Sequence, residues 1–288
     1  MKIVKEIDQN ILNDEICLIP TMGALHEGHV SLIKKGKEFG LLTMVTIFIN
    51  ELQFDSKEDF NNYPSKIEDD IKTLDNLDID YLFIPENNYI YPDSGFEKID
   101  SGAIGKKFEG KSRPGHFDGM LTVVNRLFQL TLPKIAIFGK KDAQQLFLIK
   151  EMVNRKKYPI KIFEGLTVRD NLGLALSSRN LLLSKHGEEK ARLINQILDH
   201  SKKEFCETKD LNIFKKLKSY YSDGDIEIDY LAIVDSETFG DPLEQTENYI
   251  IIIAAHIENI RLIDNIEFKL ERVCKKLLLL MLATARQL

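Results

Sequence analysis

Two histidines three residues apart, His26 and His29, follow a short apolar run near the start of the chain. They belong to PTMGALHEGHVSL (20–32), which comes directly after EICLI. Gly23 permits a tight turn, and Gly28 lets the backbone approach a ligand closely. A helix that begins near Gly28 would offer unpaired N–H groups and its positive dipole end to an anion, and the imidazoles would add donors that can become cationic. The pattern favours phosphate binding.

A metal site and an ordinary tight turn remain open for the same stretch. No third candidate ligand clusters with the two histidines, and HEGH lacks the HExxH spacing of zinc peptidases. Residues elsewhere in the chain must decide between the three interpretations.

Two further stretches could hold a small polar substrate. FINELQF (48–54) ends an expected strand with the neutral amides Asn50 and Gln53, which suit hydroxyl or carboxylate groups. GKKFEGKSRPGHFDG (105–119) is rich in glycine and basic residues. It could contribute to a pocket, or it could be a solvated loop.

Phosphate-binding residue types also occur in FGKKDAQQL (138–146), where a strand again leads into a helix. Gly139 would make the turn, Lys140 and Lys141 would supply charge, and Asp142 could reach a ribose or a bound metal. Later, ALSSRN places two hydroxyls beside an arginine, which suits a polyphosphate, although the same residues could form a helix N-cap or turn.

Jointly these stretches predict a nucleotide site with many donors and few carboxylates. The chain contains no Ser-His-Asp spacing, no nucleophilic cysteine motif, no GxxxxGK[ST] and no GxGxxG. The expected chemistry is therefore stabilisation of negative charge on a transferring phosphoryl group, without a covalent enzyme intermediate.

The elements that must position these residues alternate in the first half of the chain. Apolar runs predict strands at 15–20, 41–50, 79–85, 134–139 and 160–168, and helical spacing predicts helices at 29–40, 67–78, 119–133 and 142–157. Such alternation predicts an α/β fold with a parallel sheet and helices on both faces. Helices at 184–206 and 213–223 and strands at 226–235 and 249–257 then predict a smaller α+β domain from residue 168 onward.

Composition excludes some classes of partner. The 288 residues carry a net charge of −6, which argues against a surface that coats nucleic acid. Three scattered cysteines form no CxxC pair, the charged N-terminus lacks the apolar core of a signal peptide, and no apolar run reaches the length of a membrane span. We therefore expect a cytoplasmic protein with neither a nucleic-acid nor a membrane partner.

Six stretches occur in the order found in pantothenate synthetases (pantoate–β-alanine ligases), and the chain resembles this family from about residue 2 to residue 268. They are PTMGALHEGHVSLI, FINELQF, FEGKSRPGHFDGMLTVVNRLF, FGKKDAQQL, TVRDNLGLALSSRN and IRLIDN. HxGH is shared by nucleotidylyltransferases and class I aminoacyl-tRNA synthetases, whereas RPGHFDGMLTVV, KDAQQL and ALSSRN are more specific to the family.

The resemblance implies a Rossmann-like N-terminal domain (1–167), a C-terminal lid domain (168–268) and a homodimer, and it leaves a tail (269–288) unassigned. It also implies ATP with Mg²⁺ and two steps. Pantoate would first form pantoyl adenylate with release of pyrophosphate. The amine of β-alanine would then displace AMP to give pantothenate. The apolar residues 277–283 favour a packing helix or an oligomer contact for the tail, and a reading-frame extension stays open.

The resemblance also assigns site residues. Catalytic roles would belong to His29, as proton donor to the departing group, to His26 and to Lys141. Pantoate and then β-alanine would be held by Gln53, Asn50 and Gln145. Arg113 and His116 would lie near the reacting centre, and no metal ligand is assigned. ATP would contact Met22, Gly23, Ala24, Leu25, His26, Glu27, Gly28, His29, Gly139, Lys140, Lys141, Asp142, Val168, Leu176, Ser177, Ser178 and Arg179.

Five positions depart from the family pattern: Glu51, Lys140, Ala143, Leu172 and Glu258. We expect them to affect ATP affinity and lid packing more than reaction type. Two other functions stay open at this point, a nucleotidylyltransferase with a phosphate acceptor and a non-catalytic nucleotide sensor. The first should carry additional cations where this chain has amides, and the second would have no need to keep His29, Lys141 and Gln53.

Overall fold

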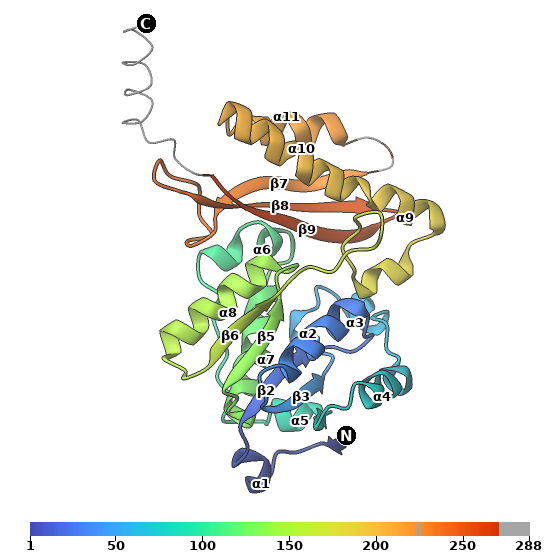
Figure 1. Cartoon of the computed structure of the whole chain (residues 1–288), viewed down its shortest axis with the longest axis vertical. Coiled ribbons are helices and arrows are strands. Elements are labelled where there is room, and N and C mark those ends of the chain that lie inside the picture. Colours follow the sequence, from blue (N-terminus) through green and yellow to red (C-terminus); the bar gives the residue numbers. More distant parts are fainter. Residues whose placement is uncertain (223, 225, 271–288) are drawn as a thin grey trace, which may run out of the picture.

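The computed structural model describes residues 1–222, 224 and 226–270. Within them the chain forms a six-stranded sheet and a three-stranded sheet, one above the other in Figure 1. We call the six-stranded sheet with its helices the first part, and the three-stranded sheet with its helices the second part. The predicted boundary at 167/168 falls after the last strand of the first part and before the first helix of the second part. Most of the predicted tail lies outside the described residues.

All strands of the first sheet run parallel, in the order β1-β4-β3-β2-β5-β6. The apolar runs of the sequence form its centre, because strands covered on both faces need continuous hydrophobic side chains. Each strand that the sequence predicts is confirmed, while the short first strand was not predicted. The strands are β1 (Lys2–Val4), β2 (Ile16–Thr21), β3 (Leu42–Ile47), β4 (Tyr81–Phe83), β5 (Ile135–Gly139) and β6 (Lys161–Gly165).

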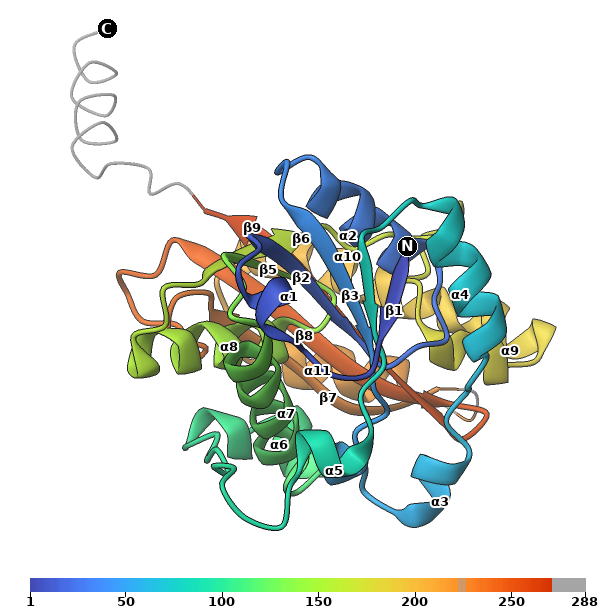
Figure 2. The same ribbon diagram turned by 90° about the horizontal axis from the view of Figure 1, so that it is seen from below.

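Helices cover both faces of this sheet, as predicted (Figure 2). Ile33 of α2 and Leu74 of α4 pack with apolar strand residues on one face. Phe128 of α7 and Ile149 of α8 belong to the larger cluster on the other. The helices of this part are α1 (Gln9–Leu12), α2 (Glu27–Lys37), α3 (Lys57–Asn61), α4 (Ile67–Asn76), α5 (Asn87–Ile90), α6 (Glu109–Ser112), α7 (His116–Thr131) and α8 (Ala143–Lys156), with the 3₁₀ turns η1 (Glu51–Gln53) and η2 (Ile104–Lys106).

The second sheet is antiparallel, in the order β7-β8-β9, and is made of β7 (Glu227–Asp235), β8 (Asn248–Ile257) and β9 (Ile260–Lys269). On its outer face lie α10 (Leu193–Thr208) and α11 (Ile213–Tyr221) (Figure 1). The isoleucines of β8 alternate: Ile251 and Ile253 pack with these helices, and Ile252 packs with Phe239 toward the first part. Both faces of β8 are thus covered, which explains its unbroken apolar run.

Two elements of the second part differ from the sequence prediction. The single helix expected at 184–206 is two helices, α9 (Lys185–Ala191) and α10, which meet at Arg192 so that Ala191 and Ile194 both enter one core cluster. β9 was not predicted as a strand. The 3₁₀ turn η3 (Ser178–Leu182) precedes α9.

Candidate active site

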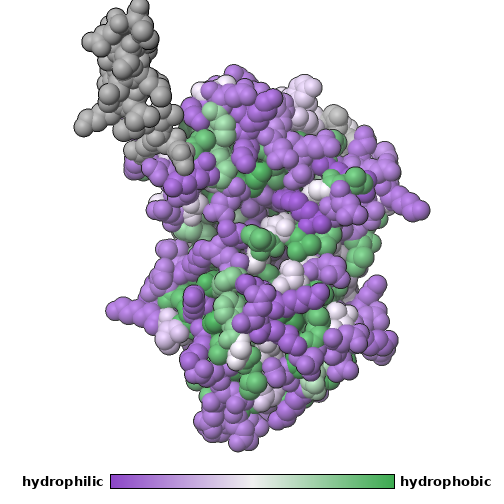
Figure 3. All heavy atoms as spheres, in the orientation of Figure 1, coloured by the Kyte–Doolittle hydropathy of each residue, from purple (hydrophilic) through white to green (hydrophobic). Residues whose placement is uncertain are grey.

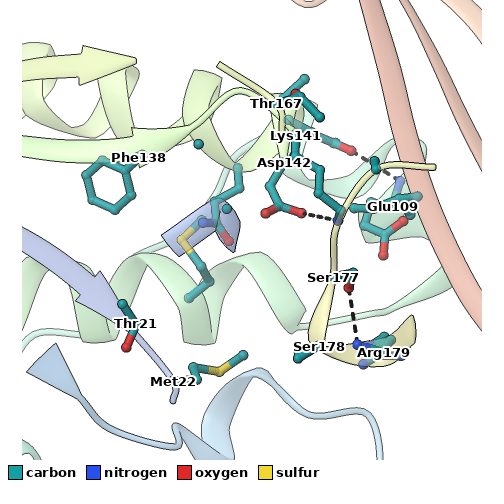
Figure 4. Close-up of a pocket in the computed structure, with 18 of the residues that line it drawn as sticks. Thr21, Met22, Glu109, Phe138, Lys141, Asp142, Thr167, Ser177, Ser178 and Arg179 are labelled. Carbon is teal, nitrogen blue, oxygen red and sulfur yellow. Dashed lines mark hydrogen bonds and ion pairs between the residues drawn. The ribbon is translucent and has the colours of Figure 1, made fainter. Parts of the chain in front are cut away.

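A cavity of about 310 Å³ opens where the strand order of the first sheet changes direction. β2 pairs with β3 on one side and with β5 on the other, so the loops after β2 and β5 diverge and leave a crevice at the carboxyl ends of the strands. Figure 4 shows Thr21 at the end of β2 and Met22 in the loop after it, Lys141 and Asp142 in the loop after β5, and Ser177 to Arg179 around this space. Figure 3 shows hydrophobic side chains at the middle of a mainly hydrophilic face, between the two parts.

The two histidines form the N-terminal cap of α2. Nδ1 of His26 accepts a hydrogen bond from the backbone N–H of Gly28 (3.1 Å), and Nδ1 of His29 accepts one from the N–H of His26 (3.3 Å). A neutral imidazole that accepts at Nδ1 carries its proton on Nε2. The rings lie 4.1 Å apart at their centroids and both line the cavity, so each provides one N–H donor there.

Both imidazoles are neutral at physiological pH. Burial and the nearby Lys141 charge lower the pKa of His26 to about 4. Burial and the neighbouring His26 lower the pKa of His29 to about 3. They therefore act as uncharged hydrogen-bond donors, and a bound polyanion would raise both pKa values because it favours the cationic form.

Glycine is required inside this cap. A Cβ added at Gly28 would lie 2.7 Å from Cε1 of His26, so any larger residue would displace the imidazole. Gly23 has a positive φ of +83°, and a Cβ there would lie 3.0 Å from the Asp70 carboxylate. This carboxylate accepts the backbone N–H groups of Ala24 and Leu25, both at 2.8 Å.

The stretch from Met22 to His29 is therefore divided between two tasks. Met22, His26, Gly28 and His29 line the cavity, whereas Gly23, Ala24, Leu25 and Glu27 are absent from its lining. Asp70 of α4 fixes the turn through its hydrogen bonds to the backbone of Ala24 and Leu25. No sequence motif around Asp70 indicates this role.

Gln53 lies at the opposite wall, at the end of η1, and is 8% exposed. Its side-chain Nε2 donates to Sδ of Met22 (3.0 Å), and its Oε1 accepts from Nδ2 of Asn50 (2.9 Å). Asn50 also bonds the Gly119 carbonyl, the Leu52 N–H and the Tyr91 hydroxyl. The amide of Asn50 thus has its donors and its acceptor engaged, and it fixes the orientation of the Gln53 amide.

Arg113 and His116 act on the backbone of Gln53. Nδ1 of His116 donates to the Gln53 carbonyl (2.7 Å), and Nη2 of Arg113 donates to the same oxygen (3.2 Å). The remaining nitrogen of His116 lies 3.4 Å from Nη1 of Arg113, and Nε of Arg113 pairs with Asp55. Burial and the Arg113 charge lower the pKa of His116 to about 4. Both residues line the cavity, but their polar atoms are engaged by the protein itself.

The loop after β5 separates its two lysines. Lys141, Asp142 and Gln145 line the cavity together with Gly139, and Nζ of Lys141 lies 3.5 Å from Oδ1 of Asp142. Lys140 does not line it. Its ammonium pairs with Glu267 of β9 and with Glu164 of β6, and these ion pairs outweigh burial and raise its pKa. The basic departure from the family pattern is therefore neutralised outside the cavity.

The segment after β6 supplies another wall. Val168, Leu176, Ser177, Ser178 and Arg179, which the resemblance places on ATP, all line the cavity. The Ser177 hydroxyl accepts a hydrogen bond from the backbone N–H of Arg179. Ser177 is thus also the N-cap of η3, which is the alternative that the sequence left open for this stretch.

Two residues near α3 lie against the same segment. Arg179 lies 3.4 Å from Asp59, and the Tyr63 hydroxyl lies 3.4 Å from that of Ser178. Tyr63 was not singled out from the sequence, because its place depends on a loop more than 100 residues away in the chain.

The second sheet completes the lining with residues that sequence reasoning gave no role. Arg261 of β9 pairs with Glu109 of α6 and with Asp229 of β7, and the Tyr230 hydroxyl donates to Glu109. Asn265 of β9 bonds the loop after β5. Arg261 and Asn265 belong to the stretch IRLIDN. The family resemblance of this stretch was the only feature of the sequence that could have indicated them as site residues.

Comparison with known proteins decides the family. A sequence model described as pantoate-beta-alanine ligase matches residues 1–267. The chain belongs to this family. It is 42% identical to the pantothenate synthetase of Chlorobium phaeobacteroides (strain BS1) over 87% of this chain and 88% of that one. It is 40% identical to that of Thermosipho africanus (strain TCF52B) over 91% and 96%.

Solved structures of pantoate–β-alanine ligases have the same fold. The pantothenate synthetase of Thermus thermophilus superposes with a TM-score of 0.83 at 32% identity, over 92% of this chain and 99% of that one. The ligase of Francisella tularensis, solved with beta-gamma ATP and beta-alanine, gives 0.76 at 37% identity, over 92% and 97%. The predicted fold and family are confirmed, and the chain is a ligase that joins pantoate to β-alanine.

Two absences hold for the described part of the chain. Residues 1–222, 224 and 226–270 contain no group of three His, Cys, Asp or Glu side chains that could hold a metal ion. None of the helices within these residues has the length and apolarity needed to cross a bilayer.

Proposed function

We propose that this pantoate–β-alanine ligase activates pantoate with ATP, through a pantoyl adenylate bound in the cavity between the two sheets. One observation carries the proposal: the N–H donors of His26 and His29 and the ammonium of Lys141 line the same cavity as the amides of Gln53 and Gln145. Cationic and N–H donors suit phosphates, and neutral amides suit the hydroxyl and carboxylate groups of pantoate. The beta-gamma ATP and beta-alanine bound to the Francisella ligase support the same substrates here.

In the first step, a pantoate carboxylate oxygen attacks the α-phosphorus of ATP and the bond to pyrophosphate breaks. Negative charge then grows on the departing oxygens. The ammonium of Lys141 and the Nε2–H groups of His26 and His29 would stabilise this charge, helped by the N-terminus of α2. His29 would donate a hydrogen bond to the departing group. It could give up a proton only after the bound phosphates have raised its pKa and made it an imidazolium.

In the second step, the amine of β-alanine attacks the acyl carbon of the adenylate. The bond from this carbon to the phosphate oxygen breaks, AMP leaves, and the amine gives up one proton to yield the amide. Gln53 would hold pantoate first and β-alanine afterwards, with Gln145 on the other side. Asn50, Arg113 and His116 would keep Gln53 in place and need not touch the substrate.

Mg²⁺ would enter with ATP. Such an ion would be held mainly by phosphate oxygens and water, as is common for nucleotide enzymes. Asp142 is the carboxylate beside Lys141 on the cavity wall, and it could contact such an ion or the ribose. The ion would neutralise phosphate charge while Lys141 and the histidines orient the phosphates.

We also propose a cytoplasmic homodimer in which the second sheet acts as a lid. Cys17 and Cys206 are free thiols, which suits a reducing compartment. The ion pair between Glu109 and Arg261 joins the second sheet to the first part beside the cavity, where a lid would close. Sedimentation at several concentrations would measure the oligomeric state, and a monomer at micromolar concentration would contradict the dimer.

Pyrophosphate release tests the proposed reaction. The enzyme is mixed with ATP, Mg²⁺ and pantoate, with and without β-alanine. We expect one equivalent of pyrophosphate per active site with pantoate alone, and continuous release once β-alanine is added. Release that requires β-alanine from the start would contradict a separate adenylate, and release without pantoate would contradict pantoate activation.

A further inference from the structure

We propose that Asn265 is a positioning residue that sets the place of Lys141 from the opposite sheet. This inference rests on the proposed role of Lys141 at the phosphates. Asn265 lies on β9, is 9% exposed and lines the cavity. Its side-chain Nδ2 donates to two successive backbone carbonyls, those of Lys140 (2.9 Å) and Lys141 (2.7 Å).

The loop that carries Lys141 depends on this contact. β5 ends at Gly139 and α8 begins at Ala143, so the residues between belong to neither element. The N–H of Lys140 donates to the Gly165 carbonyl (2.8 Å), which fixes the start of the loop. The two carbonyls that follow it are held by one carboxamide of the second sheet, whose two hydrogens match two adjacent acceptors.

Asn265 itself is held firmly. Its backbone pairs with Ile252 of β8, and its carbonyl accepts from Nη2 of Arg169 (3.2 Å). The same guanidinium pairs with the buried carboxylate of Asp264. A rigid donor on β9 can therefore fix the loop after β5, and the Lys141 ammonium moves with that loop. Charge stabilisation depends on placement within a fraction of an ångström. Loss of the two hydrogen bonds from Asn265 should therefore slow the step in which Lys141 is proposed to take part.

The matching variant is Asn265→Ala, which leaves both carbonyls without their donor. We expect pyrophosphate formation from ATP and pantoate to slow by about tenfold or more, since small misplacements of catalytic groups cost that much. The KM for β-alanine, and the rate at which supplied pantoyl adenylate reacts with β-alanine, should stay within about twofold of the original, because the role proposed for Lys141 is on the pyrophosphate, which has left before β-alanine attacks. Asn248→Ala, on β8 and outside the cavity lining, is the control and should leave both steps unchanged.

A double-mutant cycle decides whether the effect passes through Lys141. Lys141→Ala alone should slow pyrophosphate formation by about 10². Adding Asn265→Ala to it should then change the rate by less than about twofold, because the group that Asn265 places is gone. Additive losses, equal losses in both steps, or no effect of Asn265→Ala would each overturn the proposal.

Two controls keep the test interpretable. If Asn265→Ala does not fold, Asn265→Ser is measured in the same cycle. Failure of the original enzyme to release pyrophosphate with pantoate would refute the proposed reaction itself. If the original enzyme is active but the effects of the Lys141 and Asn265 substitutions are additive, only the positioning role of Asn265 is refuted.

Discussion

Neighbouring lysines have opposite surroundings in this site. Lys141 lines the cavity, whereas Lys140 pairs with Glu164 and Glu267 outside it. The sequence placed both on ATP, because the letters GKKD do not show which side chain of a loop turns inward. The direction is set by the hydrogen bond of Lys140 N–H to Gly165 and by the carboxylates nearby.

This difference predicts opposite results for two adjacent substitutions. Lys141→Ala should slow pyrophosphate formation by about 10², because it removes charge stabilisation in the transition state. Lys140→Ala should change the rate by less than about threefold, because it removes two partly exposed ion pairs outside the cavity. Single-turnover measurements with saturating ATP and pantoate would compare them. Equal losses in the two variants would show that the assignment of the lysines is wrong.

The buried His116 predicts a pH dependence of stability. Its folded pKa is about 4, lower than the ordinary histidine value of 6.5, because burial and Arg113 disfavour the cation. Below pH 6.5 the unfolded chain binds a proton that the folded protein does not, so the contribution of His116 to stability is present above pH 6.5 and is lost as the pH falls toward 4.

The matched variant is His116→Gln, measured by urea unfolding at about pH 7 and about pH 5.5. Between these two pH values, the free energy of unfolding of the original protein should fall by about 1 kcal/mol more than that of the variant. The reason is that only the original takes up this proton on unfolding. His26 and His29 contribute equally to both proteins and cancel. Identical losses would mean that His116 titrates normally in the folded state.

At the scale of elements, the turn η1 and helix α7 meet at Gly119. A Cβ added there would lie 2.0 Å from the Leu52 carbonyl oxygen. This close approach lets Asn50 bond the Gly119 carbonyl while it holds Gln53. Glycine at this position is therefore part of the placement of Gln53, although Gly119 itself does not line the cavity.

Gly119→Ala should push η1 away from α7 and weaken pantoate binding by about tenfold or more, with ATP binding nearly unchanged. The control is Gly240→Ala, whose Cβ would meet only the Thr238 hydroxyl at 3.4 Å. Calorimetric titration with each ligand would measure both affinities. Equal loss of ATP and pantoate binding in Gly119→Ala would point to general unfolding.

The sequence predicted elements well where burial alone decides them. β2, β3 and β5 are apolar runs because both of their faces are covered, and α2 begins at Glu27, close to the start near Gly28 that the sequence predicts. β9 was missed because its polar residues, such as Arg261 and Asn265, face a protein interface and not solvent. The sequence of β9 therefore lacks the regular alternation of apolar and polar residues that identifies a strand with one solvent-exposed face. Its polar residues are explained only by the surface of the first part that they contact.

At the scale of the whole molecule, the ion pair between Glu109 of α6 and Arg261 of β9 joins the second sheet to the first part. The side chains are 6% and 12% exposed. Glu109 also accepts from Tyr230, and Arg261 also pairs with Asp229. The sequence could not reveal this pair, because its partners lie 152 residues apart and neither stretch suggests the other.

Arg261→Ala would leave the Glu109 carboxylate buried with its main cation gone. We expect a loss of about 3–5 kcal/mol in the free energy of unfolding, as for other broken buried pairs. Lys5→Ala breaks the exposed pair with Glu86, whose side chains are 71% and 63% exposed, and should cost less than about 1 kcal/mol. Urea unfolding would measure both, and similar small losses would show that the buried pair contributes little.

The position of β9 at the cavity also bears on how the enzyme is made. The ribosome synthesises β9 after every other described element, yet β9 supplies Arg261 and Asn265 to the site. A nascent chain that has folded only its parallel sheet would already contain His26, His29 and Lys141, but it would lack the strand that supplies Arg261 and Asn265 to the lining. Partly made chains should thus carry an open crevice with the groups proposed to bind phosphate, and the complete cavity appears only when β9 has joined the fold.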